Sequence, residues 1–371
     1  MKNFYLTCCL LFSINCHANT IISIERGLTL AQVSVNDQTH TIAVIADKGD
    51  LVEGIDISAL SGTPGDMLSV YKALGYDRIV QLLQLAPQTA FNNYLFSVLE
   101  SPAGTKSHHI ALGFNYAEHA DEINEKHLPF LFLRTLTATR EQAIGYSPNR
   151  LLDYEVEICA RPISDITQYS DFENTAFGFF LCGDFTDRAY LMRNMDMDNM
   201  RSGKGFNGAK SVPGYFPTGP YMVIPKNRRE FIKDIDFSLA RNGEIKQHAN
   251  AGEMIWPLDT ILRQAFNAHT HRTPTFAESS RQWLPENMLS ADTVIVTGTP
   301  QGVIMKPPGL SFKILHGSKY IFSGAVFSMK ATDYIIEEYI KFLTKEEIFL
   351  KPGENILMRA KFLGSVRVKI E

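Results

Sequence analysis

The heptapeptide Leu152-Asp153-Tyr154-Glu155-Val156-Glu157-Ile158 alternates acidic and apolar side chains. Successive side chains of a β-strand point to opposite faces, so a strand here places Glu155 and Glu157 on one face and apolar side chains on the other. Two carboxylates on one face repel each other unless a cation or a basic side chain lies between them. The segment therefore predicts either a strand that contributes to a cation site or an edge strand with a solvated polar face.

A third carboxylate, Asp184, lies 27 residues beyond Glu157, at the end of the apolar run Phe179-Phe180-Leu181-Cys182-Gly183. An aspartate in this position can be a turn residue, a helix cap or a third oxygen ligand. Three carboxylates with open coordination positions suit a hard ion such as Mg²⁺, Mn²⁺ or Ca²⁺. No histidine or thiolate supplies a ligand at this spacing, which argues against zinc.

The segment from Gly113 to Glu122 carries His119 three residues before Glu122. On one helical turn these two side chains share a face. A carboxylate beside an imidazole fixes its tautomer and raises its basicity, which is what a general base needs to take a proton from water. The same pair is also common on surface helices that have no function.

Two glycine-rich segments carry further polar side chains. Thr297 to Gly302 follows an apolar strand, and its glycines allow backbone N–H groups to approach an anion, although a strand-ending turn has the same composition. Lys204 and Lys210 lie in a glycine-rich loop that ends at Pro220, and most lysines in such loops are solvated.

The order of these and further segments resembles that of the fumarylacetoacetate hydrolase superfamily, over about residues 106 to 371. Its members show N-Y-x-x-H-x-x-E, an apolar-Phe-basic stretch, L-D-Y-E-x-E, D-x-T-x-R, a K-S loop running to P-T-G-P, N-G-E, T-G-T-P-x-G-V and L-x-P-G-[DE]. The matching segments are, in this order, Asn115–Glu122, Leu131–Arg134, Leu152–Glu157, Asp184–Arg188, Lys210–Pro220, Asn242–Glu244, Thr297–Val303 and Leu350–Glu354.

The resemblance implies a metal centre and a general base at matching positions. Glu155, Glu157 and Asp184 would hold Mg²⁺, or else Mn²⁺ or Ca²⁺, and adjacent oxygens of a small oxo-acid substrate would chelate that ion. His119, oriented by Glu122, would activate a water molecule for attack on the carbonyl group that is cleaved.

The resemblance also implies contacts to the substrate. Lys210 and Arg188 would stabilise an oxyanion or a departing enolate. Thr299 would lie where backbone and hydroxyl donors bind a substrate carboxylate, and Tyr116 is a further expected substrate contact.

The chain departs from the family pattern in several places. Arg134 stands where a lysine is common, and Leu191 stands where many members have a glutamine. The loop before Lys210 is longer than usual, so Lys204 is a rival for the same role. Residues 304–349 are expected to be an insertion with a helix of its own. These departures leave the choice of substrate open.

The expected fold class is α+β and rich in β-structure, a mixed β-sheet roll of the fumarylacetoacetate hydrolase type with a small N-terminal domain. The expected units are a signal peptide (1–18), the small domain (19–105) and the catalytic domain (106–371). Strands are predicted at 154–160, 177–181, 235–239, 293–297 and 356–362, and helices at 256–265 and 333–343. In the small domain, Thr63 is predicted to cap a helix that ends at Gly75, followed by a second helix at 79–85.

The first residues are typical of a secretory signal peptide. Lys2 gives a positive start, an apolar run extends from Phe4 to Ile14, and Ala18 is a small residue suited to cleavage. The run is shorter than the roughly 20 residues that span a bilayer. We therefore expect a periplasmic or secreted protein that is free of the membrane after cleavage. An apolar first strand and lipid attachment at Cys16 are the alternatives.

The composition is that of a folded soluble protein, with 45% hydrophobic and 20% charged residues. A formal net charge of −4 provides no basic footprint, so nucleic acid is not an expected partner. The expected partners are a small oxo-acid and, from the family resemblance, a second copy of the chain in a homodimer.

Removal of the signal peptide would leave two cysteines, Cys159 and Cys182. Each lies two residues from a carboxylate, Glu157 or Asp184, and faces the same way on its strand. If Glu157 lies opposite Asp184 in antiparallel strands, the two cysteines also lie opposite each other and can form a disulfide in an oxidising compartment. Two small buried thiols are the simpler expectation.

Three functions follow from these patterns. The leading hypothesis is hydrolytic cleavage of a carbon–carbon bond in a small β-diketo acid, such as an acylpyruvate or fumarylacetoacetate. The second is lyase or isomerase chemistry on the same substrate class: decarboxylation of oxaloacetate, or isomerisation or hydration of an oxo-dienoate. The third is a non-catalytic homologue that binds an exported metabolite.

Overall fold

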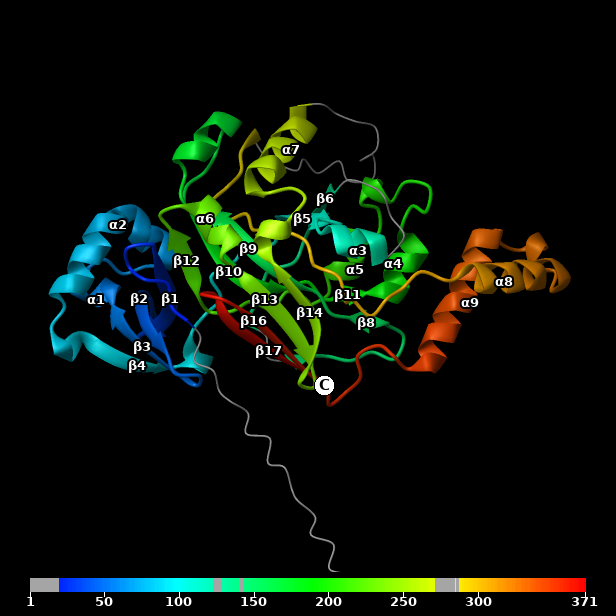
Figure 1. Ribbon diagram of the computed structural model, residues 1–371, viewed down its shortest axis with the longest axis horizontal. Coiled ribbons are helices and arrows are strands. Elements are labelled where there is room, and N and C mark those ends of the chain that lie inside the picture. Colours follow the sequence, from blue (N-terminus) through cyan, green and yellow to red (C-terminus); the bar gives the residue numbers. More distant parts are fainter. Residues whose placement is uncertain (1–19, 123–128, 141–142, 271–283, 285–286) are drawn as a thin grey trace, which may run out of the picture.

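The computed structural model describes residues 20–122, 129–140, 143–270, 284 and 287–371 (Figure 1). The expected signal peptide lies outside these residues. Within them the chain forms a ten-stranded sheet, a five-stranded sheet and a two-stranded sheet, with helices around them. The predicted class, α+β and rich in β-structure with a mixed sheet, is confirmed.

The ten-stranded sheet forms the body of the molecule. Its neighbouring strands are antiparallel except β15 and β5, which run parallel. In spatial order its strands are β4 (Phe91–Leu95), β3 (Leu51–Asp56), β2 (Gln38–Asp47), β1 (Gly27–Val35), β12 (Met222–Pro225), β10 (Phe177–Gly183), β9 (Val156–Pro162), β15 (Ile295–Val296), β5 (His109–Gly113) and β6 (Phe130–Arg134).

Strands from the first hundred residues continue this sheet, because β1 pairs with β12. They form its outer part, next to α1 and α2, at one end of the molecule (Figure 1). The predicted boundary near residue 105 therefore falls between strands of one continuous sheet, and the division into two domains stays a prediction.

The five-stranded sheet packs on one face of β9 and β10. Its order is β14 (Glu244–Asn250), β13 (Asp236–Arg241), β16 (Asn355–Ala360), β17 (Gly364–Ile370) and β7 (Ala143–Ile144). The short sheet pairs β11 (Thr186–Asp187) with β8 (Leu152–Asp153). Val156 and Ile158 of β9 share one apolar cluster with Phe237 and Met358 of the five-stranded sheet, so the predicted apolar face of the strand is confirmed.

The opposite face of β9 and β10 borders a second apolar cluster. This cluster contains Cys159, Phe180 and Cys182, together with Phe206 and Phe216. Strand β9 is thus buried on both faces and lies inside the sheet, between β10 and β15. The interpretation of this segment as a solvated edge strand is wrong.

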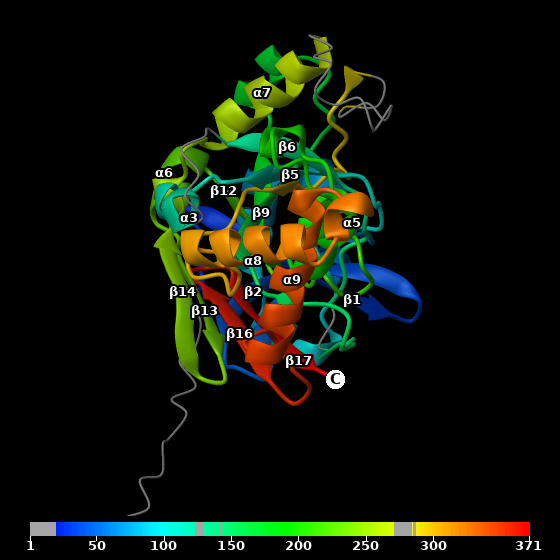
Figure 2. The same ribbon diagram turned by 90° about the vertical axis from the view of Figure 1, so that its right-hand side faces the viewer.

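Within the part of the chain that the structure describes, four helices have 13 residues or more and the others are shorter. Their bounds are α1 (Ile57–Ser61), α2 (Met67–Leu85), α3 (Ala117–Glu122), α4 (Arg188–Asn194), α5 (Phe206–Lys210), α6 (Arg228–Lys233), α7 (Leu258–Thr270), α8 (Leu310–Phe322) and α9 (Ala331–Glu346). Helices α8 and α9 project from the body at the end opposite α1 and α2 (Figures 1 and 2). No helix within the described residues has the length and hydropathy needed to cross a membrane.

The predicted start of the first long helix is wrong by three residues. Asp66, not Thr63, is the N-cap of α2, and its carboxylate accepts a hydrogen bond from the Ser69 N–H at 2.7 Å. Gly75 interrupts the helix with φ 72° and ψ 167°, as the sequence predicted, because glycine adopts a positive φ without a steric penalty.

Cys159 and Cys182 form a disulfide, with their Cα atoms 6.0 Å apart. The expectation of two free thiols is therefore wrong. The register that we assumed is also wrong, because Cys182 lies opposite Glu157 and Cys159 lies opposite Phe180. The bond joins diagonal neighbours on one face of two antiparallel strands, which are close enough for side chains to meet.

Reduction of this disulfide should lower the free energy of unfolding by about 3 kcal/mol, because the bond closes a loop between cysteines 23 residues apart in the sequence. Urea unfolding with and without a reductant measures the change. Thiol titration of the unreduced, unfolded mature protein gives the independent check. Two reactive thiols per chain would show that the bond does not form.

Candidate active site

Three carboxylates converge where β9 and β10 end side by side. Glu155 directly precedes β9, Glu157 lies within it, and Asp184 directly follows β10. The Asp184 N–H donates to the Glu155 carbonyl at 2.9 Å, which extends the antiparallel pairing by one residue pair. Asp184 therefore lies opposite Glu155 and not, as we assumed, opposite Glu157.

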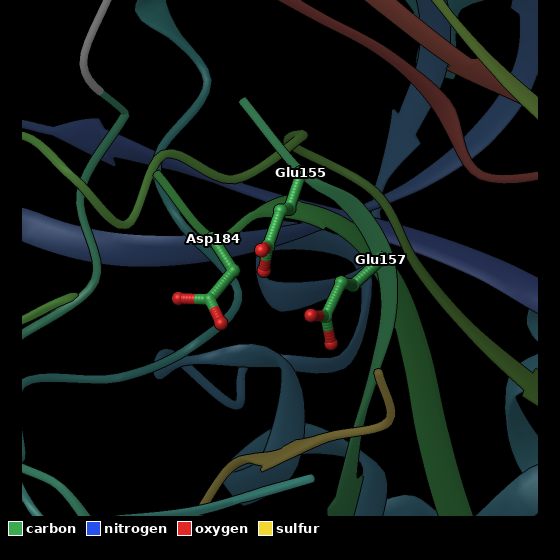
Figure 3. Close-up of side chains that lie close together, drawn as sticks. All are labelled: Glu155, Glu157 and Asp184. Atoms are coloured by element: carbon green, nitrogen blue, oxygen red, sulfur yellow. The ribbon is translucent and has the colours of Figure 1, made fainter. Parts of the chain in front are cut away.

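The three side chains point into one shared space (Figure 3). One oxygen of each carboxylate lies within 4.8 Å of the corresponding oxygens of the other two. Their residues are 4%, 1% and 0% exposed, in the order Glu155, Glu157, Asp184, so water does not screen the repulsion between them. A cluster of this kind needs positive charge nearby.

Lys210, the last residue of α5, supplies part of that charge. Its ammonium group lies 2.5 Å from Glu155 Oε2 and 2.7 Å from Asp184 Oδ2, and it donates to Thr186 Oγ1 at 2.9 Å. Lys210 is buried, whereas Lys204 is exposed. The structure therefore places Lys210, and not its rival, among the carboxylates.

Two buried arginines complete the positive side of the cluster. Arg188, the first residue of α4, donates through Nε to Asp153 Oδ2 at 2.8 Å and through Nη2 to Glu155 Oε1 at 2.6 Å. Arg134, the last residue of β6, forms an ion pair with Asp184. Because Arg134 is fully buried and bound to a carboxylate of the cluster, the basic residue at this position belongs to the site.

The buried charges of this cluster do not cancel when all the groups are ionised. Among the described residues, four buried carboxylates lie with three buried cations: Asp153, Glu155, Glu157 and Asp184 with Arg134, Arg188 and Lys210.

The pKa of Glu157 reflects this surplus of negative charge. Burial and the nearby Glu155 carboxylate raise the pKa of Glu157 to about 8. Burial also acts to raise the pKa of Glu155, but Lys210 and Arg188 outweigh it and hold that pKa at about 2. Glu157 therefore keeps its proton to a higher pH than an ordinary carboxyl group, and a cation beside it would relieve the same repulsion.

A pocket of about 480 Å³ has His119 and Arg188 in its wall. Arg188 joins this pocket to the carboxylate cluster through its hydrogen bonds to Asp153 and Glu155. His119 is buried in α3, with its ring centre 6.0 Å from that of Phe114. Phe114 adopts φ 59°, a conformation that costs energy in a bulky residue and recurs at functional sites. The site thus combines a carboxylate cluster with an imidazole and a cavity for a small molecule.

Residues 108–371 match the family model described as the C-terminal part of fumarylacetoacetate hydrolase. The chain belongs to the fumarylacetoacetate hydrolase family. The resemblance noted from the sequence motifs is thereby confirmed.

Curated relatives and solved structures are also similar to this chain. The chain is 26% identical over 226 residues to a 4-hydroxyphenylacetate degradation bifunctional isomerase/decarboxylase of Escherichia coli, over 58% of this chain but only 44% of that protein. It therefore spans less than half the length of this relative.

Two solved structures share the fold at low identity. Fumarylacetoacetate hydrolase from Exiguobacterium antarcticum has a TM-score of 0.53 and 18% identity, over 93% of this chain and 99% of that one. The 2-hydroxyhepta-2,4-diene-1,7-dioate isomerase from Mycobacterium marinum has a TM-score of 0.51 and 14% identity, over 92% and 98%.

The carboxylate cluster of this family member fits a divalent cation. The donor set consists of carboxylate oxygens, which are the ligands that hard ions such as Mg²⁺, Mn²⁺ and Ca²⁺ prefer. The raised pKa of Glu157 indicates that an additional positive charge beside it would relieve its repulsion from the Glu155 carboxylate. Glu155, Glu157 and Asp184 could therefore hold such an ion.

Two predicted substrate contacts are engaged within the protein. The Thr299 hydroxyl donates to the Val156 carbonyl at 3.0 Å and accepts a hydrogen bond from Gln247, so its proton is not available to a substrate. The Tyr116 ring lies in the core between the sheets, 6.0 Å from Phe237, and its role in substrate binding stays a prediction. The predicted orienting carboxylate, Glu122, has a side chain outside the described part of the chain.

Several residues that position the site were not singled out from the sequence. Asp153 accepts from Arg188 and from the Ile304 N–H at 2.9 Å, which ties the strand to the loop before α8. Asn115 donates to the Thr297 carbonyl at 2.8 Å and so fixes the start of α3 against β15. Both residues lie inside quoted motifs, but only the structure shows what they contact.

Proposed function

We propose that this chain is a divalent-metal-dependent hydrolase that cleaves a carbon–carbon bond in a β-diketo acid of the acylpyruvate type. The observation that supports the proposal most is the cluster of three buried carboxylates, which Arg188 joins to the pocket that His119 lines. Membership of the fumarylacetoacetate hydrolase family supports it. We propose Mg²⁺ as the ion, with Mn²⁺ or Ca²⁺ as substitutes.

When bound, the ion would supply Lewis-acid polarisation of the substrate oxo group. The protein groups would do the rest. His119 would take a proton from the attacking water, since an imidazole is matched to proton transfer near neutral pH. Lys210 and Arg188 would hold fixed positive charge beside the oxygen that becomes negative as the bond breaks, in a site from which burial excludes most water.

A second candidate is isomerase or decarboxylase activity on the same class of oxo-acid. The curated Escherichia coli relative bears the name of a bifunctional isomerase/decarboxylase, which favours this candidate. The two reactions would share the carboxylates and the chelated oxo-acid. They differ in whether a water molecule must be activated.

The His119→Ala protein should lose hydrolysis of an acylpyruvate by about 10²- to 10⁴-fold, because a general base contributes on that scale. Binding of Mn²⁺ to the carboxylates should remain, and calorimetry provides that control. Steady-state assays with an acylpyruvate and with oxaloacetate, both in the presence of Mg²⁺, separate the candidates. Unchanged hydrolysis in the variant would exclude His119 as the base.

We also propose that the mature chain is exported and works in an oxidising compartment as a homodimer. The Cys159–Cys182 disulfide supports the compartment, because such bonds persist mainly outside the cytosol. N-terminal sequencing of the protein from its native host should begin after Ala18. A mature protein that still begins at Met1 would contradict export, and a monomer in sedimentation equilibrium would contradict the dimer.

A further inference from the structure

The pocket lined by His119 and Arg188, which reaches the carboxylates through Arg188, is larger and more apolar than a small oxo-acid needs. Its volume of about 480 Å³ is in the range that accommodates a drug-sized molecule. We propose that the substrate carries an uncharged apolar group of several carbon atoms, which occupies this pocket while its oxo-acid end lies at the carboxylates. This inference rests on the proposed function and specifies its substrate class.

Methionines form one wall of the pocket. Met192 lies on α4, Met195, Met197 and Met200 follow it, and Met305 comes from the loop before α8. These are five of the 12 methionines in the chain, so they are concentrated in this wall. Unbranched thioether side chains are flexible and polarisable, and they adapt to apolar ligands of different shapes.

Helix α9 supplies another part of the pocket wall. Ile335, Ile336 and Tyr339 face the pocket from this helix, which packs on α4. Lys313 and Thr332 also line the pocket, but both are exposed and therefore lie at its rim. The lining is thus mostly apolar, with His119 and Arg188 as polar groups on the side of Arg188 that contacts Glu155, and with Lys313 and Thr332 at the rim.

The charges in the pocket disfavour a second carboxylate on the substrate. Among the described residues that line it, the side chains with a permanent charge are Arg188 and Lys313. Arg188 already donates to Asp153 and Glu155, and Lys313 is solvated at the rim. A carboxylate placed among the apolar side chains of the lining would lose its hydration without gaining a cationic partner there, whereas an alkyl or aryl group gains from burial.

Calorimetric titration of the Mn²⁺-loaded protein with 2-oxo-alkanoates tests this inference. The series runs from pyruvate to 2-oxooctanoate, and 2-oxooctanedioate serves as the control of equal chain length with a second carboxylate. We expect binding to tighten about three- to fourfold for each added methylene. The dicarboxylate should bind at least about tenfold more weakly than 2-oxooctanoate.

A pair of isoleucine variants localises the effect. Ile336→Gln places a polar amide in the pocket wall. This variant should show a smaller increase in binding affinity for each methylene added to the oxo-acid. Ile314→Gln makes the same change on α8, where the residue is 62% exposed and does not line the pocket, and should leave the gain at the wild-type value. If both variants lose the increase in affinity per methylene equally, the apolar group of the ligand does not bind in this pocket.

The outcomes separate this inference from the proposed function. If short oxo-acids bind and affinity does not rise with chain length, the inference of an apolar group on the substrate is wrong, while the proposed function stands. If no oxo-acid binds, pyruvate included, the proposed chelation of an oxo-acid fails and this inference fails with it. If the dicarboxylate binds as tightly as 2-oxooctanoate, the pocket does not select an apolar group.

Discussion

The Glu157→Gln protein should bind Mn²⁺ or Mg²⁺ at least about 100-fold more weakly than the wild type and should lose metal-dependent turnover. Loss of groups that only support metal ligands already costs 10- to 100-fold in affinity, and loss of a charged ligand costs more. The fold should persist, because a glutamine oxygen can still accept the hydrogen bond that Gly298 N–H donates to Glu157 at 2.5 Å. Calorimetric titration of the metal measures the change.

The protonation of Glu157 should be visible in the pH dependence of stability and of metal binding, when the Glu157→Gln variant is compared with the wild type. Because the pKa of Glu157 is raised from 4.5 to about 8, the folded metal-free protein keeps a proton that the unfolded chain releases. This group therefore lowers the free energy of unfolding as pH rises from about 5 towards 8, and metal binding should tighten over the same range as the proton becomes easier to displace. Both pH effects should be weaker in Glu157→Gln.

Glu244→Gln is a matched control for this prediction. Glu244 begins β14 in the five-stranded sheet, and its side chain is 74% exposed. The control should bind metal as the wild type does. A Glu157→Gln protein whose metal affinity stays within about threefold of the wild-type value would contradict the assignment of Glu157 as a ligand.

The Lys210→Met protein should lose about 3–5 kcal/mol of unfolding free energy when no metal is present. The ammonium group contacts both Glu155 and Asp184, and its removal leaves buried carboxylates without compensation. A bound divalent cation should restore more stability in this variant than in the wild type, because it replaces the missing positive charge and binds only the folded state. Urea unfolding with and without Mg²⁺ provides the measurement.

Turnover of Lys210→Met should fall by about 10²- to 10³-fold even with saturating Mg²⁺, since one donor to a developing oxyanion contributes on that scale. Lys204→Met is the control, because Lys204 is exposed in the same loop region. The control should change neither stability nor turnover. Equal stability of the two variants without metal would show that Lys210 does not compensate the carboxylates.

The sequence predicted the faces of the site strands but not their pairing. Alternation assigns Glu155 and Glu157 to one face whatever lies opposite. A shift of register by two residues leaves every side chain on the same face, so the pattern could not decide whether Asp184 lies opposite Glu155 or Glu157. For the same reason the pattern allowed a disulfide between Cys159 and Cys182 without showing that it is diagonal.

The pocket and the arrangement of positive charges could not be derived from the sequence. Met200, Met305 and Ile336 come together only through packing of α9 on α4. The choice between Lys204 and Lys210 depends on the path of a glycine-rich loop, where Gly205 adopts φ 83° and its backbone lies against Asn194. The periodicity of apolar residues within one segment does not predict contacts between segments that are far apart in the sequence.

Anomalous diffraction from crystals soaked in Mn²⁺ would test the central claim most directly. The account predicts one strong manganese peak in contact with carboxylate oxygens of Glu155, Glu157 and Asp184, and no such peak in crystals of Glu157→Gln. A peak elsewhere, or none at a saturating concentration of Mn²⁺, would contradict a metal-dependent enzyme at this site.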